Sequence, residues 1–159
     1  MLHTLAVLVD NNPGVLTRVA GLFARRAYNI SSLSVCQTEN PAISRMTIVV
    51  EGDDQVIEQV TKQLNKLVVV HKVSDLTREA VVDRELALIR IKVKSETRLE
   101  VLQTVDIFRG RVVDMGKSNF TIELTGDEEK IDAFVRTIRP YGLLELVRTG
   151  KIAISRLDT

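Results

Sequence analysis

The sequence predicts an α+β protein built from two tandem βαββαβ units. Short runs rich in β-branched residues alternate with segments whose apolar residues recur at helical spacing. The order strand, helix, strand, strand, helix, strand is complete by about residue 73 and begins again at residue 86. This order is the split, ferredoxin-like arrangement. The predicted domains are residues 1–76, a polar linker over 77–85, and residues 86–159.

In the first half, turn and cap signals separate the elements. Pro13 is expected as the first helical residue, because the first helical N–H has no intrahelical partner, and the Asp and Asn residues before it are expected to cap. Asp53 and Asp54 are expected to start the second helix. The predicted elements are a strand over 3–9, a helix over 13–27, strands over 28–37 and 45–51, a helix with apolar residues from Val56 to Leu67, and a strand over 68–73.

The second half repeats this order after the charged segment that ends at Glu85. Thr97 and Glu100 have the spacing of a capping box. Pro140-Tyr141-Gly142 is expected to end the last helix. The predicted elements are a strand over 86–94, a helix over 97–108, strands over 110–115 and 119–125, a helix over 127–138, and strands over 143–148 and 152–156.

The two halves can be aligned residue by residue. Met46-Thr47-Ile48 matches Phe120-Thr121-Ile122 at an offset of 74, and Leu22-Phe23 matches Ile107-Phe108 at an offset of 85. The difference predicts an extra loop in the first half, around residues 36–44. At the larger offset Asn11 and Gly14 fall on Glu96 and Leu99, so the second half lacks the Asn-x-Pro-Gly corner. This favours a ligand role for that corner over a purely structural one.

Composition excludes several classes of function. The chain has 159 residues with 22 basic against 21 acidic side chains, which gives no electrostatic case for a nucleic-acid or membrane surface. An RNA-binding sheet needs stacking aromatic residues, and these make up 4% of the chain. No apolar run approaches a membrane span or the core of a signal peptide. With a single cysteine, we expect a cytoplasmic protein.

Candidate catalytic residues are few. No phosphate-binding, dinucleotide-binding or zinc-protease motif occurs. The two histidines, His3 and His71, are expected at the surface or at strand edges, and Cys36 is expected to be half-buried in a strand. The acidic residues at 127–129 fit helix capping rather than acid–base chemistry. Arg109 and Arg111 fit solvated helix-end charge, with contact to a protein partner as the alternative.

The corner at the end of the first strand is the strongest candidate for a binding site. A helix start offers N–H groups and a positive dipole end to an anion, and Gly14 lets a ligand approach the backbone. A free amino acid fits this chemistry, because its carboxylate suits those N–H groups and its ammonium group suits carboxamide oxygens. The sequence does not distinguish valine from leucine or isoleucine, because one methylene changes binding by only about 1–3 kcal/mol.

Four segments carry a recognisable pattern. The longest is LAVLVDNNPGVLTRVAGLFARRAYNISSL at residues 5–33, and the others are Ser44-Arg45-Met46-Thr47-Ile48, Ile107-Phe108-Arg109-Gly110 and Glu145-Leu146-Val147-Arg148-Thr149-Gly150. Together they resemble the regulatory small subunits of acetolactate synthase (acetohydroxyacid synthase) of the bacterial type, with Ala27 where that family usually has glycine. The resemblance implies that residues 1–76 form an ACT domain.

The resemblance also implies a function. The chain is expected to be non-catalytic, to activate a catalytic large subunit that uses thiamine diphosphate, Mg and FAD, and to confer feedback inhibition by valine. The chain itself is expected to bind no cofactor and no metal. ACT domains of this kind pair in a homodimer with the effector between chains. The effector residues carried over are Asn11, Pro13, Gly14, Val15 and Leu16 of one chain and Asn29 and Ile30 of its neighbour.

Two alternatives stay open at this stage. One is an ACT-domain amino-acid sensor that regulates a different enzyme, and the Ile-Phe-Arg-Gly and Arg-Thr-Gly segments favour acetolactate synthase over it. The other is an independent enzyme, for which the sequence offers no nucleophile, metal or cofactor motif.

Overall fold

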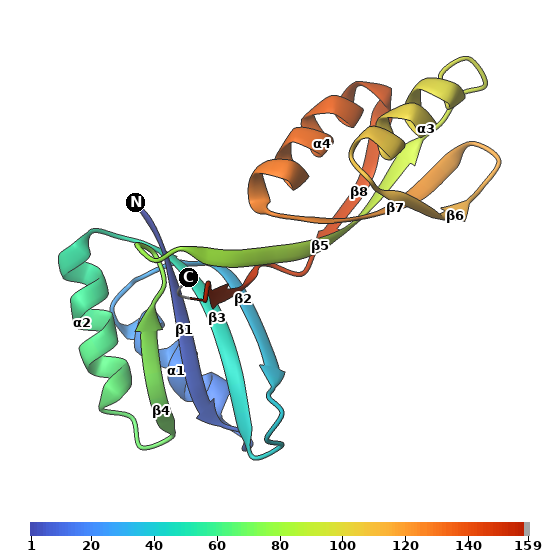
Figure 1. Cartoon of the computed structure of the whole chain (residues 1–159). Helices are drawn as coiled ribbons and strands as arrows, with labels where there is room; N and C mark the ends of the chain where they lie inside the picture. The colour runs from blue at the N-terminus through green and yellow to red at the C-terminus, as the bar shows by residue number, and fades with distance from the viewer. Residues whose placement is uncertain (158–159) are drawn as a thin grey trace. The chain divides into compact units, whose positions relative to one another are not determined.

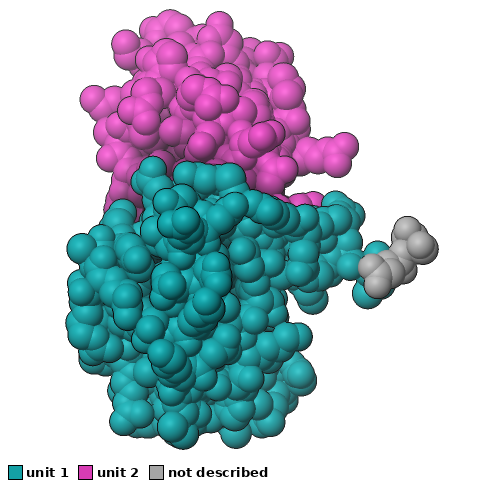
Figure 2. Space-filling view, turned by 90° about the vertical axis from the view of Figure 1, so that its left-hand side faces the viewer, with its two compact units in different colours: residues 1–82, 152–159 teal, residues 83–151 magenta. Residues whose placement is uncertain are grey.

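A computed structural model describes residues 1–157 of the chain. The fold divides into two compact units (Figures 1 and 2). Unit 1 consists of Met1–Val82 together with the chain from Ile152 onward, and unit 2 consists of Asp83–Lys151. Each unit contains one βαββαβ motif, so the predicted α+β fold with two tandem motifs is confirmed.

Unit 1 is an antiparallel sheet with two helices. The strand order is β2-β3-β1-β4, so β2 and β4 are the edges. Its elements are β1 Leu2–Asp10, α1 Val15–Arg25, β2 Ile30–Gln37, β3 Ile43–Glu51, α2 Asp54–Asn65 and β4 Val70–Asp75.

Unit 2 repeats the plan with the strand order β6-β7-β5-β8. Its elements are β5 Val81–Lys92, α3 Arg98–Ile107, β6 Arg111–Met115, β7 Asn119–Gly126, α4 Glu128–Gly142 and β8 Leu143–Arg148. A ninth strand, β9 Ile152–Ser155, pairs with β5.

Each unit has its own hydrophobic core between the helices and one face of the sheet. In unit 1 alternate residues of β1 (Leu5, Val7 and Val9) pack against Phe23 of α1 and its neighbours. In unit 2 the corresponding strand supplies Ala87, Ile89 and Ile91, and the helices supply the rest. The two-residue period of the strands and the helical spacing of the helices therefore account for both cores.

The predicted caps are confirmed at two helices and wrong at two. The side chains of Asp53 and Asp127 accept hydrogen bonds from the third backbone N–H of α2 and α4. No side chain caps α1, which begins after Gly14 rather than at Pro13. Thr97 does not cap α3 either, because its hydroxyl is engaged with the backbone of Lys94.

Pro140 does not end the last helix as expected. α4 continues through it to Gly142, whose positive φ of 116° allows the chain to turn directly into β8. Glycine adopts this conformation without the steric cost that a side chain would bring.

The expected domain boundaries differ from the compact units of the structure. β5 already begins at Val81, so the segment 77–85 is not an irregular linker throughout. Residues from Ile152 belong to unit 1, because Ala153 packs with Ala6 and Leu76 on the sheet face opposite the helices. A guanidinium N–H of Arg45 also donates to the carbonyl of Ala153 at 2.8 Å.

The structure also corrects the alignment of the two halves. The left-handed residues that follow α1 and α3 are Ala27 and Arg109, 82 positions apart. The turns that lead into these helices close at Val15 and Thr97, again 82 positions apart. Gly14 therefore corresponds to Glu96, and the offset of 85 at the helices is wrong. The conclusion stands that unit 2 lacks the Asn-x-Pro-Gly corner.

The extra residues of the first half lie in two places rather than in one loop. The pair Val35–Met46 corresponds to Met115–Phe120, so the offset falls from 82 at the helices to 80 at β2 and 74 at β3. Most of the extra length is therefore in the β2–β3 hairpin, and the remainder lies between α1 and β2.

Candidate functional site

The corner between β1 and α1 is a tight turn over Asn12-Pro13-Gly14-Val15. The Val15 N–H points to the Asn12 carbonyl at 3.4 Å, and Gly14 has φ 84° and ψ −8°. Proline followed by a residue with positive φ is the pattern of a type II turn. A side chain at Gly14 would meet no atom within 4 Å, so the turn is open to solvent. Glycine is needed here for its backbone conformation and not for internal packing.

The first amides of α1 are available to an anion. Within residues 1–157, the N–H groups of Gly14, Leu16 and Thr17 donate to no backbone acceptor, and no side chain caps the helix. α1 has no acidic residue in its first turn, whereas α2, α3 and α4 each have at least one. A helix N-terminus carries a partial positive charge of about half an elementary charge. At α1 no acidic side chain in the first turn compensates this charge.

Asn11 connects this corner to the β2–β3 hairpin. Its backbone N–H donates to the Ala42 carbonyl at 2.8 Å, and its side-chain amide donates to the Pro41 carbonyl at 2.8 Å. A carbonyl accepts only from the NH2 group, so this bond fixes the amide orientation and leaves the Asn11 oxygen exposed as an acceptor. In the hairpin turn, the Thr38 hydroxyl donates to the Asn40 and Ile43 carbonyls, and the Asn40 side-chain oxygen accepts from the Ala42 N–H.

The remaining predicted residues of the corner differ in exposure. Pro13 and Gly14 are exposed, and the Leu16 side chain is 48% exposed. Val15 is 5% exposed and packs into the core of unit 1. A ligand at the corner can therefore contact the Leu16 side chain, but it reaches Val15 only through the backbone.

Asn29 and Ile30 lie at the other end of the sheet. Ile30 pairs with Val50, which pairs with His3 near the start of β1, while Asn11 follows the last residue of β1. At about 3.4 Å per residue, the seven steps from His3 to Asp10 span roughly 24 Å. One chain therefore does not bring the two predicted groups together. Asn29 is exposed and Ile30 is half-buried.

A contact that the sequence did not reveal lies next to the corner. β4 has a bulge opposite Leu8 and Val9, where His71 is the additional residue. The His71 ring nitrogen Nε2 lies 2.6 Å from Asp10 Oδ1, and both side chains are partly exposed. Bulges commonly redirect a side chain, and no sequence signal marked this one. The expected surface position of His71 agrees with the structure.

Two other side chains differ from expectation. His3 is 1% exposed instead of lying at the surface, and neither of its ring nitrogens has a hydrogen-bond partner among the described residues. Cys36 is exposed on the edge strand β2 instead of half-buried.

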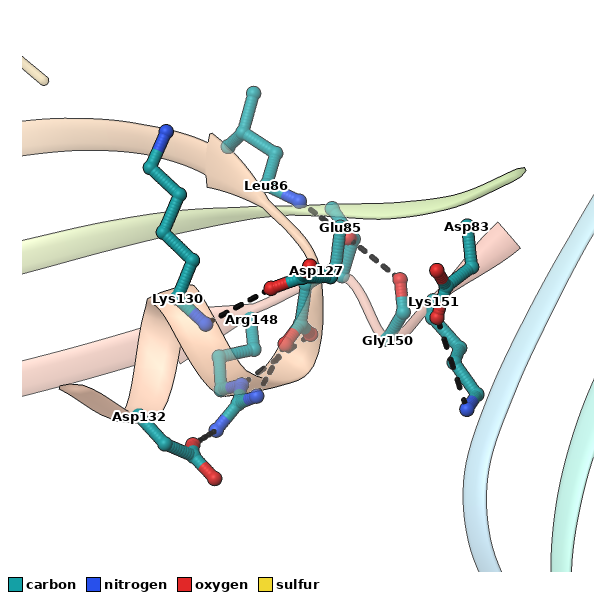
Figure 3. A network of polar contacts seen from close by, with 10 residues as sticks. Asp83, Glu85, Leu86, Asp127, Lys130, Asp132, Arg148, Gly150 and Lys151 are labelled. Atoms are coloured by element: carbon teal, nitrogen blue, oxygen red, sulfur yellow. Dashed lines mark hydrogen bonds and ion pairs between the residues drawn. The ribbon is translucent and has the colours of Figure 1, made fainter. Parts of the chain in front are cut away.

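In unit 2 the densest polar network is structural in character (Figure 3). Arg148 of β8 forms ion pairs with Glu85 of β5 and, at 2.7 Å, with Asp132 of α4. The Glu85 side chain is only 4% exposed. The hydrogen bond to the Glu85 carboxylate raises the pKa of the Arg148 guanidinium above its usual range. Close by, Lys151 faces Asp83 at 3.9 Å.

Neither metal-binding clusters nor membrane-spanning helices are present in the described part. No group of three or more His, Cys, Asp or Glu side chains within residues 1–157 is arranged to hold a metal ion. No helix among these residues is both long and apolar enough to cross a membrane.

Comparison with known proteins identifies both halves. Residues 5–72 match the family described as the AHAS small subunit-like ACT domain, and residues 84–157 match the family described as the small subunit of acetolactate synthase. A probable acetolactate synthase small subunit from Archaeoglobus fulgidus is 58% identical over 98% of each chain. The chain belongs to the acetolactate synthase small-subunit family.

Further relatives agree with this assignment to the small-subunit family. The acetolactate synthase small subunit of Mycolicibacterium smegmatis is 47% identical over 97% of this chain and 91% of that protein. The crystal structure of the small subunit from Thermotoga maritima superposes with a TM-score of 0.92 and is 42% identical, covering 100% of this chain and 99% of that chain. The predicted ACT domain in the first half is confirmed by the family match.

Proposed function

We propose that this chain is the regulatory, non-catalytic subunit of an acetolactate synthase. It binds the catalytic large subunit, raises its activity and makes it sensitive to feedback inhibition by valine or a related branched-chain amino acid. Thiamine diphosphate, Mg and FAD belong to the catalytic partner in this proposal, and this chain binds none of them. Membership of the small-subunit family supports the partner, and the uncapped start of α1 supports the effector.

The effector site proposed here combines two chains of a homodimer. The carboxylate of the amino acid accepts hydrogen bonds from the free amides at Gly14 and Leu16, where the helix dipole favours negative charge. Its ammonium group donates to the exposed oxygen of Asn11, while the Leu16 side chain contacts its branched end. Asn29 and Ile30 come from the neighbouring chain, since in their own chain they lie at the far end of the sheet from the corner.

Reconstitution tests this proposal. The purified chain is added to its cognate catalytic subunit, and acetolactate formation is measured with and without valine, leucine and isoleucine. We expect stimulation by the chain and inhibition by at least one of the three amino acids only when the chain is present. No stimulation and no response to any of them would contradict the proposed function.

A further inference from the structure

Arg45 of β3 links the sheet of unit 1 to the last strand of the chain. Its neighbour Met46 points into the core, so the half-buried Arg45 side chain lies on the sheet face opposite the helices. Within residues 1–157 its guanidinium forms one hydrogen bond, to the Ala153 carbonyl of β9 at 2.8 Å, and no ion pair with a carboxylate. Arg45 therefore holds β9 rather than balancing a negative charge.

β9 is a short strand with few buried contacts on unit 1. Ala153 is 6% exposed, whereas Ile152 and Ile154 on either side of it are 61% and 63% exposed. The strand thus buries one small side chain on this face. Beyond it, the backbone N–H of Arg156 donates to the Ala80 carbonyl at 2.8 Å. Segments with few buried apolar contacts open more readily than the core, so β9 can exchange between a docked and a released position.

The proposed effector corner lies close to Arg45 along two strands. On β3, Arg45 is two residues past Ile43, where the β2–β3 hairpin ends. Across the sheet it pairs with Leu8, which is two residues before Asp10 at the end of β1. Two residues of a strand span roughly 7 Å. A change in the hairpin that contacts the corner therefore reaches Arg45 through a short, hydrogen-bonded part of the sheet.

Unit 2 shows that the fold does not require this arginine. At the offset of 74 found for β3, Arg45 corresponds to Asn119, which has an uncharged side chain. The same face of the unit 2 sheet carries an exposed ion pair between Arg90 and Glu145. Residues 83–151 contain neither the Asn-x-Pro-Gly corner, nor the longer hairpin, nor the arginine that holds β9. The three features occur together in unit 1, which associates Arg45 with the effector site rather than with the fold.

We propose that Arg45 couples the effector corner to β9, so that effector binding favours the docked position of β9. This inference rests on the proposed function and adds how binding is communicated beyond the site. An amino acid at the corner stabilises the hairpin and the start of β3, and Arg45 then keeps its bond to the Ala153 carbonyl. Arg45 is a positioning residue, because it contacts β9 and not the effector. Since coupling is reciprocal, release of β9 lowers effector affinity.

Hydrogen exchange of the full chain with and without effector tests the coupling. The effector is whichever of valine, leucine and isoleucine binds the unaltered chain most tightly by titration calorimetry. Arg45→Met removes the donors, Arg45→Lys keeps a charged donor, and Ala153→Lys places a long charged side chain at the buried position. The matched control is Lys72→Met, because Lys72 is exposed and pairs with Leu8 from the other side of β1.

We expect the effector to slow exchange at residues 152–156 in the unaltered chain and in Lys72→Met, but not in Arg45→Met. At residues 38–42 it should slow exchange in all three, because the corner itself is intact. Arg45→Met and Ala153→Lys should each weaken effector binding by about fivefold or more. The double variant should lose no more than the larger single effect, because both changes release the same strand. Arg45→Lys should restore part of the affinity and of the protection.

Equal protection of residues 152–156 in Arg45→Met and in the unaltered chain would overturn the coupling. An unaltered chain that binds effector without any change at these residues would overturn it too, and both outcomes leave the proposed function standing. Unchanged effector affinity in Ala153→Lys would overturn it independently of how Arg45→Met folds. An unaltered chain that binds none of the three amino acids would overturn the effector site and the coupling together.

Discussion

The side-chain amide of Asn11 donates to the carbonyl of Pro41 at 2.8 Å. This bond joins two features that unit 1 has and unit 2 lacks, the Asn-x-Pro-Gly corner and the longer β2–β3 hairpin. Replacing Asn11 by aspartate removes the donor and places a carboxylate against a carbonyl oxygen. A single hydrogen bond contributes roughly 1 kcal/mol, so we expect effector affinity to fall by about fivefold to tenfold.

Calorimetric titration with valine checks this prediction, together with hydrogen exchange at residues 38–42. The control is Asn12→Asp, because the Asn12 side chain is exposed and makes no hydrogen bond within the described chain. Exchange in the hairpin should become faster in Asn11→Asp and stay unchanged in the control. Equal affinity and equal exchange in the two variants would show that the hairpin is not held by Asn11.

Gly14→Asp should abolish the effector response and leave activation of the catalytic subunit largely intact, because a carboxylate would occupy the place of the ligand's carboxylate. At φ 84° any side chain brings strain, so the matched control is Gly14→Asn. Asparagine tolerates this conformation better than most residues and carries no charge. Inhibition curves for valine separate charge from shape. If Gly14→Asp kept full valine sensitivity, the corner would not be the carboxylate site.

His3→Leu should stabilise unit 1. The imidazole is buried, and both nitrogens lack partners among residues 1–157, so it loses hydration without gaining a hydrogen bond. Removing such a group commonly gains about 1–3 kcal/mol, which should appear as a higher unfolding temperature. His71→Leu is the comparison, because its ring is partly exposed and contacts Asp10, so its replacement should not raise the unfolding temperature. A lower unfolding temperature for His3→Leu would indicate that the imidazole has a partner outside the chain.

Arg148→Leu should destabilise unit 2 by about 3–5 kcal/mol, because it leaves the buried Glu85 carboxylate without its partner. The comparison variant is Arg90→Leu. In the unaltered chain Arg90 pairs with Glu145 at 3.0 Å, and both side chains are exposed. Such surface pairs contribute less than about 1 kcal/mol. Urea unfolding of both variants measures the difference. If both variants lost the same free energy of unfolding, the Glu85–Arg148 pair would stabilise unit 2 no more than an exposed ion pair does.

The fold could be predicted from the periodicity of apolar residues. The helix N-caps could be predicted only where an aspartate directly precedes the helix. Asp53 and Asp127 were recognisable because capping depends on residue type and local spacing. At Asn12-Pro13-Gly14 the same reasoning was wrong, because the positive φ of Gly14 turns the chain before the helix starts. The predicted cap at Thr97 was also wrong, because the Thr97 hydroxyl hydrogen-bonds the backbone of Lys94.

The site was predictable only in part. The Asn-x-Pro-Gly corner and its absence from unit 2 could be read from the repeat. The bond from Asn11 to Pro41 and the approach of His71 to Asp10 depend on a hairpin and a bulge, whose geometry has no residue signature. The burial of Val15 follows from the direction of the helix, so its side chain belongs to the core rather than to a ligand.

The proposed effector site needs residues of two chains, and a mixed dimer tests this requirement most directly. Gly14→Asp and Asn29→Ala chains carry different affinity tags, and the mixed dimer is purified by both. Each variant alone should bind no valine. In the mixed dimer, the Gly14 corner of one chain meets Asn29 of the other, so titration calorimetry should find about one valine per two chains. A mixed dimer that binds no valine would contradict the two-chain site.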